Sequence, residues 1–578
     1  MDIATLYNAN LNNIITAKTA IDTLFSAFGK HVESWQHDVA DKLSASHWTG
    51  STSATAQGRI KDFGGELQAA HQELSFVSKA LANAAEQFAL AQAHLVNALG
   101  DAKNAKLNVA PDGRITWNNE PTSPDFAGAS AEQTAIAISN RITAALNEAA
   151  HADQEISARL NHLATNASNG TGLDAATVAK DQAAETAREQ IPAAGTDPGS
   201  VKQWWTSLTD TERQNFITTH PDQIGNLDGV PAIARDEANR LNLTHLVDQY
   251  EHKPNLSDDD KRKLDGFRAI QMKLDQAKSK IPPAFLIGVS DEGQGRGILS
   301  WGNPDTAQNV SAYVPGLGTT LSAVGGKDAD RARNVWQATH NADPSASVAS
   351  IVWLGYDPPL GSRTPEVMGT PRAEKGAAAY DKFLNGLRAT HDGPPAHLVA
   401  LGHSYGSLTV GLAAQLPGGT GANDVILVGS PGTEAQKASQ LHGDPHHVWV
   451  GDAENDPVSH LPSPPRVQYD LGAANIGTST VGVLGTIAGG ALGDVASRHF
   501  APDQVWFGRD PANHEFGANR FKVADGLENS FDSHSNYMED PTGDYTADPS
   551  KRENLESINN IGQIAAGKYD NVTRQSQR

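Results

Sequence analysis

The chain reads His397-Leu398-Val399-Ala400-Leu401-Gly402-His403-Ser404-Tyr405-Gly406 in its second half. The first five residues form a short apolar run, which predicts a buried strand. The segment 407–414 that follows is rich in small and apolar residues and predicts a helix. Gly-x-Ser-x-Gly at a strand-to-helix turn is typical of a tight elbow, in which the glycines permit close backbone approach and the serine hydroxyl is exposed above the sheet. We therefore predict that Ser404 is a nucleophile.

Short apolar runs separated by helical segments surround this turn from residue 283 onward. Strands that alternate with helices form a mostly parallel sheet with helices on both faces. The runs predicted as strands are 284–289, 310–314, 348–354, 397–401, 425–428 and 447–450. We expect a catalytic domain over residues 283–545.

A serine hydroxyl needs a general base, and the base needs an acid to orient it. In folds with this elbow, the acid and then the histidine follow the serine along the chain. Three carboxylates, Asp452, Glu454 and Asp456, come directly after the predicted strand 447–450. We predict Asp456 as the acid because it lies a few residues past the strand and precedes small apolar residues, with Asp452 as the runner-up.

The predicted base is His534, in the segment Ser533-His534-Ser535-Asn536-Tyr537 near the C-terminal end of the domain. Its place after Asp456 agrees with the expected chain order. His460 and His499 remain alternatives, because the chain contains 21 histidines and an isolated one is usually a surface residue.

An acyl-transfer site also needs two backbone donors for the oxyanion. The N–H of Tyr405, directly after the nucleophile, is the first candidate. The second is the N–H of Leu317, in the glycine-containing loop 315–319 that follows the predicted strand 310–314. The other interpretation of this loop is a tight turn without a catalytic role.

Several motifs of this region together resemble an uncharacterised α/β-hydrolase family of actinobacteria. They are Val314-Pro315-Gly316, Trp353-Leu354-Gly355-Tyr356-Asp357-Pro358-Pro359, Gly402-His403-Ser404-Tyr405-Gly406-Ser407, Val428-Gly429-Ser430-Pro431-Gly432, His534-Ser535-x-Tyr537, and the upstream Gly225-Asn226-Leu227-Asp228-Gly229-Val230-Pro231 with Arg235-Asp236. The resemblance covers roughly residues 200–545. It implies an α/β-hydrolase fold with a serine triad, joined to helical segments on its N-terminal side, but it implies no particular substrate.

The expected activity is two-step acyl transfer by a Ser404–His534–Asp456 triad. Ester, thioester and amide substrates all fit this chemistry, and we expect an esterase or lipase acting on an ester or lipid ester. No metal and no organic cofactor are expected.

The first hundred residues predict two long helices with apolar seams. In the first helix the seam residues recur every seven positions, at Ile14, Ile21, Phe28 and Trp35. In the second they alternate by three and four positions, at Ile60, Phe63, Leu67, Ala70, Leu74, Val77, Leu81, Ala84, Phe88, Ala91, Leu95 and Ala98. The break at 44–51 contains Trp48 and Gly50, where glycine permits a turn and the tryptophan could cap the seam. This Trp-x-Gly between helices resembles the WXG-type hairpin proteins exported by type VII secretion systems, which pair with a second small helical protein; a plain coiled-coil hairpin is the alternative.

Five segments follow from these patterns. Residues 1–105 are the WXG-like hairpin, and 106–192 contain a β-hairpin at Asp112-Gly113 and a further long helix that packs on the bundle. Residues 193–282 are a helical connector, in which we expect the Asp, Arg and Asn side chains around 225–240 to pair with each other in a buried loop. The catalytic domain at 283–545 and a polar tail at 546–578 complete the chain.

The chain is strongly acidic and contains no cysteine. A formal net charge of −22 disfavours nucleic acid as a partner, because phosphate groups repel it. Without cysteine, disulfides, thiol nucleophiles and cysteine-based metal sites are excluded. The segment Met1–Tyr7 shows no basic region before an apolar stretch, so no signal peptide is predicted. We expect a cytoplasmic protein, or one exported to the envelope or beyond by a type VII-like route.

Residues 472–493 contain no charged side chain, and the stretch approaches the length of a membrane span. Glycine is dense in it, and a spanning helix between Asp456 and His534 would separate the predicted triad. We therefore expect a lid or a buried helical insertion, which as a lid would expose apolar surface to a lipid substrate. Contact with a membrane is expected only through this stretch. An alternative to the enzyme is a type VII-secreted interaction protein or toxin-like effector, with the hydrolase domain as payload or inactive scaffold.

Overall fold

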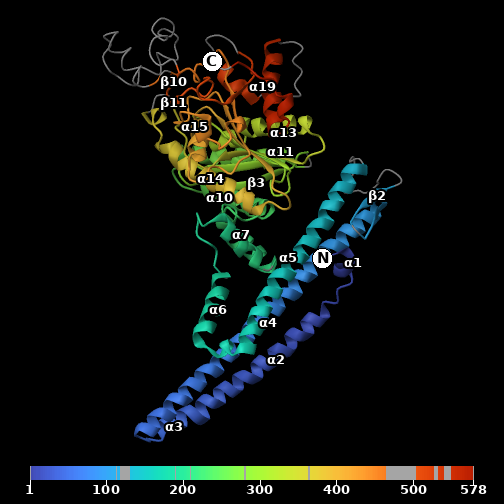
Figure 1. Cartoon of the computed structure of the whole chain (residues 1–578), viewed down its shortest axis with the longest axis vertical. Helices are drawn as coiled ribbons and strands as arrows, with labels where there is room; N and C mark the ends of the chain where they lie inside the picture. The colour runs from blue at the N-terminus through green and yellow to red at the C-terminus, as the bar shows by residue number, and fades with distance from the viewer. Residues whose placement is uncertain are drawn as a thin grey trace. The chain divides into compact units, whose positions relative to one another are not determined.

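The computed structural model describes residues 2–111, 113–117, 131–188, 190–208, 210–278, 281–361, 365–461, 463, 503–525, 532–538 and 549–576. The chain divides into two compact units (Figure 1). The first comprises Met1–Ile191 and Thr206–Asn215, and the second comprises Pro192–Trp205 and Phe216–Arg578. The stretch 472–493 lies outside the described residues. None of the helices in the described part is long and apolar enough to cross a membrane.

The first unit is built from long helices. Its elements are α1 (Ile3–Tyr7), α2 (Asn12–Trp35), the π-helical turn η1 (Gln36–Asp41), α3 (Lys42–Ala45), α4 (Ser51–Asn104), β1 (Leu107–Val109), β2 (Ile115–Trp117), α5 (Ala131–Asn169), η3 (Thr171–Leu173), α6 (Ala175–Arg188) and most of α8 (Asp210–Thr219). β1 and β2 pair antiparallel, with Val109 opposite Ile115, so the predicted β-hairpin forms. α4 packs against both α2 and α5.

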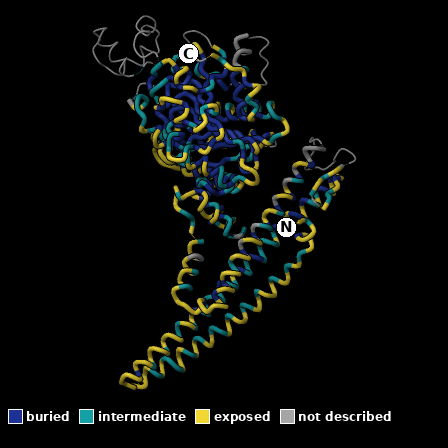
Figure 2. The backbone as a smooth tube through the Cα atoms, in the orientation of Figure 1, coloured by how far each residue is buried: buried dark blue, intermediate teal, exposed yellow. Residues whose placement is uncertain are grey.

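The turn between α2–α3 and α4 uses the predicted glycine but not the predicted tryptophan cap. Gly50 adopts a φ of +108° directly before α4, a conformation that favours glycine. Trp48 is 45% exposed, so the expectation that it caps the apolar seam is wrong. Figure 2 shows the reason: two helices alone leave this end of the hairpin largely exposed, and α2 contains no buried residue.

An eight-stranded sheet forms the centre of the second unit, in the order β12-β9-β8-β7-β5-β6-β4-β3. The strands from β12 to β6 run parallel, while β4 is antiparallel to both of its neighbours. Their bounds are β3 (Ala284–Ser290), β4 (Arg296–Trp301), β5 (Asn309–Val314), β6 (Val348–Leu354), β7 (His397–His403), β8 (Asp424–Val428), β9 (Val448–Gly451) and β12 (Asn519–Phe521). A short separate ribbon pairs β10 (Gln504–Val505) with β11 (Gly508–Arg509). The expected mostly parallel sheet is confirmed, and β4 and β12 are additions to the predicted strands.

Helices cover both faces of this sheet. The connection from β5 through α13 to β6 runs toward the β3 edge of the sheet, whereas the connections through α14 and α15 run toward the β12 edge. Because such connections are right-handed, α13 lies on one face of the sheet, and α14 and α15 lie on the other. Among the described residues, the helices of this unit are α7 (Pro198–Ser207), α9 (Pro221–Ile224), α10 (Ala232–Glu251), α11 (Asp258–Ala277), α12 (Leu321–Val324), α13 (Lys327–Ala342), α14 (Pro371–Thr390), α15 (Tyr405–Ala414), α18 (Asp532–Ser535) and α19 (Pro549–Ala565), with short turns η4 (Pro365–Met368), η5 (Ala438–Gln440), η6 (Pro445–His447), η7 (Asn536–Met538) and η8 (Tyr569–Asn571).

The polar cluster before the sheet protects the sheet's edge. β3 is the last strand, so its outer backbone groups have no neighbouring strand. The side chain of Asn226 exchanges two hydrogen bonds with the backbone of Val289, at 2.9 Å each. Asn239 donates to the carbonyl of Leu286 at 3.0 Å. The buried Arg235 pairs with Asp228 at 2.9 Å, as expected for groups that compensate each other within the fold.

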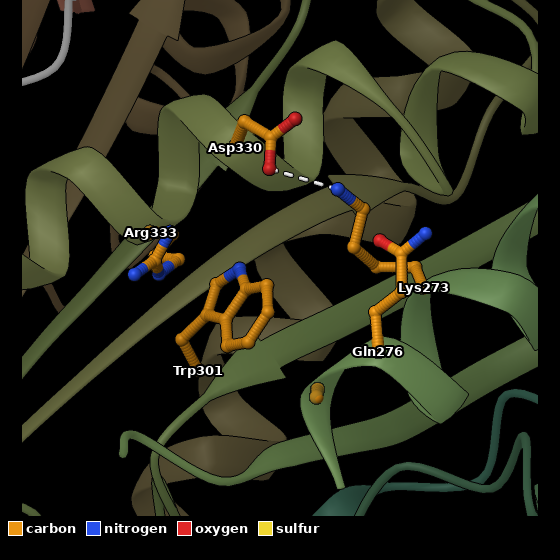
Figure 3. Close-up of a pocket in the computed structure, with 6 residues that line it drawn as sticks. Lys273, Gln276, Trp301, Asp330 and Arg333 are labelled. Atoms are coloured by element: carbon orange, nitrogen blue, oxygen red, sulfur yellow. Dashed lines mark hydrogen bonds and ion pairs between the residues drawn. The ribbon is translucent and has the colours of Figure 1, made fainter. Parts of the chain in front are cut away.

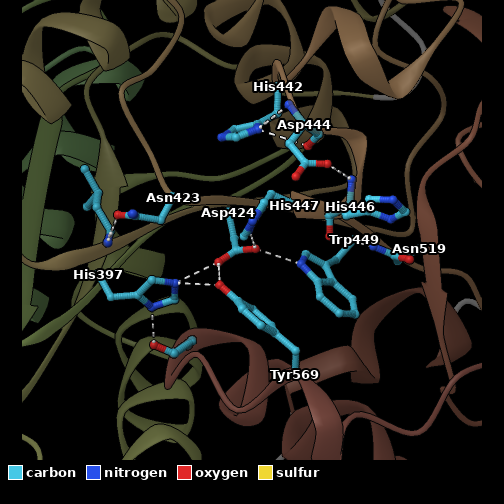
Figure 4. Close-up of polar contacts among 12 residues, drawn as sticks. His397, Asn423, Asp424, His442, Asp444, His446, His447, Trp449, Asn519 and Tyr569 are labelled. Atoms are coloured by element: carbon cyan, nitrogen blue, oxygen red, sulfur yellow. Dashed lines mark hydrogen bonds and ion pairs between the residues drawn. The ribbon is translucent and has the colours of Figure 1, made fainter.

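The C-terminal segment belongs to the same unit as the sheet. In α19, the side chains of Ile558, Ile561 and Ile564 are 0% exposed and lie in the main core. After this helix, the Tyr569 hydroxyl donates to the buried Asp424 at 2.7 Å (Figure 4). His397 and His447 also contact this carboxylate, at 2.7 and 2.9 Å. The end of the chain is therefore attached to the amino ends of β7, β8 and β9, far along these strands from the elbow.

Candidate active site

The predicted elbow is present between β7 and α15. Ser404 has a φ of +56°, a conformation that is strained for a residue other than glycine. A Cβ added at Gly402 would lie 2.5 Å from the Cα of Ser407, and one at Gly406 would lie 2.1 Å from the carbonyl oxygen of Val314. Both glycines are therefore required for the sharp turn, which aims the serine away from the strand.

The loop after β5 lies directly against the serine. A Cβ added at Gly316 would lie 2.6 Å from Ser404 Cβ and 3.0 Å from its Oγ. The loop is held by the Thr319 hydroxyl, which donates to the Gly316 carbonyl at 2.8 Å, and by the Gly318 N–H, which donates to the Pro359 carbonyl at 2.8 Å. Leu317 is half-buried between these two anchors. Tyr405 is the first residue of α15, so no preceding turn of helix accepts its N–H.

Asp456 and His534 are brought together from positions far apart in the chain. His534 Nδ1 lies 3.0 and 2.9 Å from the two carboxylate oxygens of Asp456. Gly429, at the end of β8, makes this possible: a Cβ there would lie 2.8 Å from Asp456 and 3.0 Å from His534 Nδ1. Ser404 itself bonds through its backbone N–H to the carbonyl of Val428, the residue before Gly429, at 3.0 Å. Thus serine, acid and histidine all border the carboxyl end of β8.

The carboxylate of Asp456 is held in its charged form. It is 0% exposed, and burial alone would raise its pKa. The hydrogen bond and charge of His534 oppose this effect, together with the Tyr537 hydroxyl at 2.7 Å and the Val458 N–H at 2.8 Å, and lower the pKa to about 2. A carboxylate that stays ionised can keep the imidazole Nδ1 protonated and leave Nε2 as the proton acceptor.

The other candidates lie elsewhere. Glu454 and His460 are exposed, and His460 Nε2 contacts the backbone carbonyl of Glu454 at 3.1 Å. Asp452 is buried beside β9, and its backbone carbonyl accepts a hydrogen bond from Arg520 at 2.9 Å. His499 lies outside the described residues. Among the predicted acids and bases that the structure describes, Asp456 and His534 are the pair that meets side chain to side chain, in the geometry of a triad.

Two residues at this site had no assigned role in the sequence. Tyr537, which the motif His534-Ser535-x-Tyr537 contains, bonds Asp456 through its hydroxyl and also accepts the N–H of Ala453 at 3.0 Å. His403 lies beside the nucleophile, and its ring centroid is 4.8 Å from that of His534. Position alone could have indicated both, since His403 directly precedes Ser404 and Tyr537 is three residues after His534.

Other polar clusters in the described residues are separate from this site. A small hollow on α11, β4 and α13 is lined by Lys273, Trp301, Asp330 and Arg333 (Figure 3), and it includes none of the predicted site residues. Within the described ranges, no group of three or more His, Asp or Glu side chains could hold a metal ion.

Comparisons with known proteins identify the family. A family profile described as alpha/beta hydrolase matches residues 291–465. An uncharacterized protein of Mycobacterium tuberculosis is 35% identical over 362 residues, a match that covers 58% of this chain and 52% of that protein. The chain thus spans about half the length of this relative.

A shorter relative and a solved structure were also found. An uncharacterized protein of Mycobacterium bovis is 35% identical over 227 residues, which cover 38% of this chain and 82% of that protein. The hyperthermophilic esterase of the archaeon Pyrobaculum calidifontis is 14% identical, with a TM-score of 0.26, over 57% of this chain and 97% of the esterase. From the family profile and the extensive coverage of the shorter mycobacterial relative, the chain belongs to this alpha/beta hydrolase family.

Proposed function

We propose that the protein is a serine hydrolase that cleaves esters through an acyl-enzyme. The observation that carries the proposal is the paired geometry at β8: the strained elbow of Ser404 on one side and the Asp456–His534 hydrogen bonds on the other. No described hydrogen bond joins the Ser404 hydroxyl to His534 Nε2. Such bonds are often long before substrate binds and tighten in the reacting complex.

In the proposed reaction, His534 Nε2 takes the proton of the Ser404 hydroxyl as Oγ attacks the ester carbonyl. The Tyr405 and Leu317 N–H groups stabilise the negative oxygen of the tetrahedral intermediate. His534 then gives the proton to the departing alcohol, leaving an acyl-serine. A water molecule, deprotonated by His534, cleaves this acyl group as a carboxylic acid and restores the serine.

Esters with an apolar acyl group are the proposed substrate class. The ring of Tyr405 packs edge-on against Phe507, with centroids 6.1 Å apart, directly beside the nucleophile. Phe507 is anchored to the loop after β8, where its N–H donates to the Pro431 carbonyl at 2.9 Å. The two residues are only 3% and 4% exposed, so they make the immediate surroundings of the elbow apolar without offering an open surface, and apolar surroundings favour a hydrocarbon chain over a charged group.

Labelling with a fluorophosphonate probe tests the proposal, because the probe reacts only with an activated serine. We expect the wild-type protein to be labelled and to hydrolyse p-nitrophenyl esters of graded chain length. His534→Ala should reduce the rate by at least about 10³-fold, because the hydroxyl loses its base. A folded wild-type protein that neither reacts with the probe nor cleaves any ester would overturn the proposal.

A second proposal concerns the helical hairpin, with the hydrolase domain as an exported payload or inactive scaffold. Along the α2–α4 contact, Phe25 stacks on His71 at 4.1 Å and Trp35 packs against Phe63 at 4.8 Å. These side chains are only partly covered, and Phe63 is 46% exposed. A small helical hairpin protein of the WXG type, exported with this chain by a type VII-like route, would cover the remaining apolar surface.

Co-expression with a candidate WXG-type partner tests this second proposal. We expect a stoichiometric complex by size-exclusion chromatography with light scattering, and we expect Phe63→Glu to abolish it. Lys61→Glu, at an exposed polar position on the same helix, is the matched control and should retain the complex. A complex that tolerates Phe63→Glu, or a chain that stays monomeric with every such partner, contradicts the proposal.

A further inference from the structure

The short turn that carries His534 is held by side chains from other elements. It comprises α18 (Asp532–Ser535) and η7 (Asn536–Met538). Four backbone carbonyls of this turn accept side-chain hydrogen bonds. That of Tyr537 accepts the Ser557 hydroxyl at 2.8 Å from α19, and the other three accept from side chains close to the catalytic elements. His403 Nε2 lies 2.7 Å from the His534 carbonyl, Arg331 Nη2 donates to the Ser535 carbonyl at 2.8 Å, and Asn334 Nδ2 donates to the Met538 carbonyl at 3.0 Å. We call these three side chains the carbonyl clamp.

His403 can serve as a constant donor in this arrangement. A carbonyl oxygen accepts but cannot donate, so Nε2 must carry the hydrogen. The side chain is 6% exposed; burial, followed by the nearby His534 and Arg331, holds the pKa of His403 well below its ordinary value. The hydrogen bond to the His534 carbonyl and, more weakly, the charge of Asp456 raise this pKa but do not outweigh these effects. His403 is therefore neutral at working pH, and its contact with the turn does not depend on a proton that catalysis moves.

Arg331 connects the turn to the strand that precedes the proposed oxyanion loop. Its Nη1 donates to Asp328 Oδ1 at 2.9 Å, and Asp328 is 0% exposed. The same carboxylate oxygen accepts the hydroxyl of Tyr313 at 3.2 Å. Tyr313 lies near the end of β5, the strand that leads into the loop 315–319, where Gly316 contacts Ser404. The Asp328 carboxylate thus accepts hydrogen bonds both from Tyr313, on the strand before the loop, and from Arg331, whose guanidinium group also bonds the His534 turn.

We propose that Arg331, Asn334 and His403 are positioning residues, which fix the backbone of the His534 turn so that the imidazole meets the Ser404 hydroxyl. Asp456 alone does not achieve this, because it bonds only Nδ1 and leaves the ring free to swing with its backbone. Proton transfer needs reacting atoms within hydrogen-bond reach, so a displacement of about 1 Å reduces the rate strongly. The inference rests on the proposed serine hydrolase activity.

The pair Arg331→Met and Arg333→Met tests the clamp on one helix. Arg333 is exposed at the hollow of Figure 3, two residues along α13. We expect Arg331→Met to lower kcat for a p-nitrophenyl ester about tenfold to hundredfold, the effect of losing a charge-assisted hydrogen bond, with KM within about twofold. Arg333→Met should keep wild-type kcat and KM. Equal kcat in the two variants overturns the proposal, as does a rise in KM without a fall in kcat.

The His403 substitutions test the donor itself. His403→Gln keeps an N–H at the reach of Nε2, whereas His403→Met keeps the volume without a donor. We expect kcat of His403→Gln to exceed that of His403→Met by about tenfold, with equal KM. Equal kcat in these two variants, both folded, would show that the imidazole fills space only. If His403→Met does not fold, the Arg331 pair decides the question.

Hydrogen exchange separates failure of the clamp from failure of the proposed activity. In Arg331→Met, we expect amide exchange in a peptide covering 532–538 to accelerate at least about tenfold relative to Arg333→Met, while peptides from β7 and β8 stay unchanged. This result does not require turnover. A wild-type protein without any esterase activity but with this exchange pattern would refute the activity and keep the clamp as a structural feature; unchanged exchange in Arg331→Met would refute the clamp.

Discussion

Ser404→Ala is expected to abolish both probe labelling and ester hydrolysis, with kcat falling on the order of 10⁵- to 10⁶-fold. The substitution removes the only atom that forms the acyl-enzyme bond in the proposed reaction. Alanine retains the Cβ that contacts Gly316, and the backbone N–H of residue 404 still bonds the Val428 carbonyl. The free energy of unfolding should therefore change by less than about 1 kcal/mol.

Kinetics with a short-chain p-nitrophenyl ester and a labelling gel check this expectation together. Ser439→Ala is the matched control, because Ser439 is an exposed serine outside the elbow. It should label and turn over like the wild type. If Ser404→Ala still reacts with the probe, the nucleophile is another residue and the triad assignment fails with it.

The elbow and most of the sheet could be predicted because each depends on short-range patterns. β6, β7 and β8 are fully or almost fully buried on both faces, so their sequences are continuous apolar runs. β4 escaped prediction because Gly297 and Ser300 interrupt its apolar pattern. Gly297 allows the helix α12 to pack closely here, since a Cβ would lie 3.0 Å from the Leu321 side chain and 3.2 Å from that of Val324. The glycine that allows the helix to pack closely on β4 is also one of the residues that interrupt the apolar pattern by which β4 could have been predicted.

Long-range contacts explain what the sequence left open at the chain's end. The spacing of Ile558, Ile561 and Ile564 indicated an apolar patch, but a patch of three residues does not reveal its partner. In the structure α19 packs on α13, which lies more than 200 residues earlier in the chain. The segment expected to be a tail is therefore part of the core of the second unit.

The candidate site shows the same division between local and distant information. The order of residues along the chain pointed to His534 as the base. The position after β9 left three candidates for the acid, and the local sequence favoured Asp456 without excluding the other two. The approach of Asp456 to His534 depends on the absence of a side chain at Gly429, which follows β8 and not β9. The clamp residues Arg331 and Asn334 carry no motif, because their partners are backbone carbonyls about 200 residues away.

Asp456→Asn is the substitution that separates these carboxylates, and its expected effect is a fall in kcat/KM on the order of 10⁴-fold. An asparagine amide can donate to Nδ1, which stabilises the tautomer with the proton on Nε2. That tautomer cannot accept the proton of the Ser404 hydroxyl. The geometry survives, because an asparagine oxygen in the place of Oδ1 still accepts from Val458, while the amide nitrogen in the place of Oδ2 faces the Tyr537 oxygen, which can accept a hydrogen bond. Glu454→Gln, at an exposed carboxylate of the same loop, should retain full activity.

Stability against pH gives a second measure of the same carboxylate. The pKa of Asp456 is about 2 in the folded protein, below its ordinary value of 3.8. A lowered folded pKa stabilises the protein above the ordinary value, and this contribution disappears as the pH falls from about 4 to about 2. At 1.36 kcal/mol per unit, the wild type should lose about 2 kcal/mol more unfolding free energy across this range than Asp456→Asn. Denaturant titrations at both pH values measure the difference. Parallel losses in the two proteins, together with activity retained in Asp456→Asn, would transfer the acid's role to Asp452.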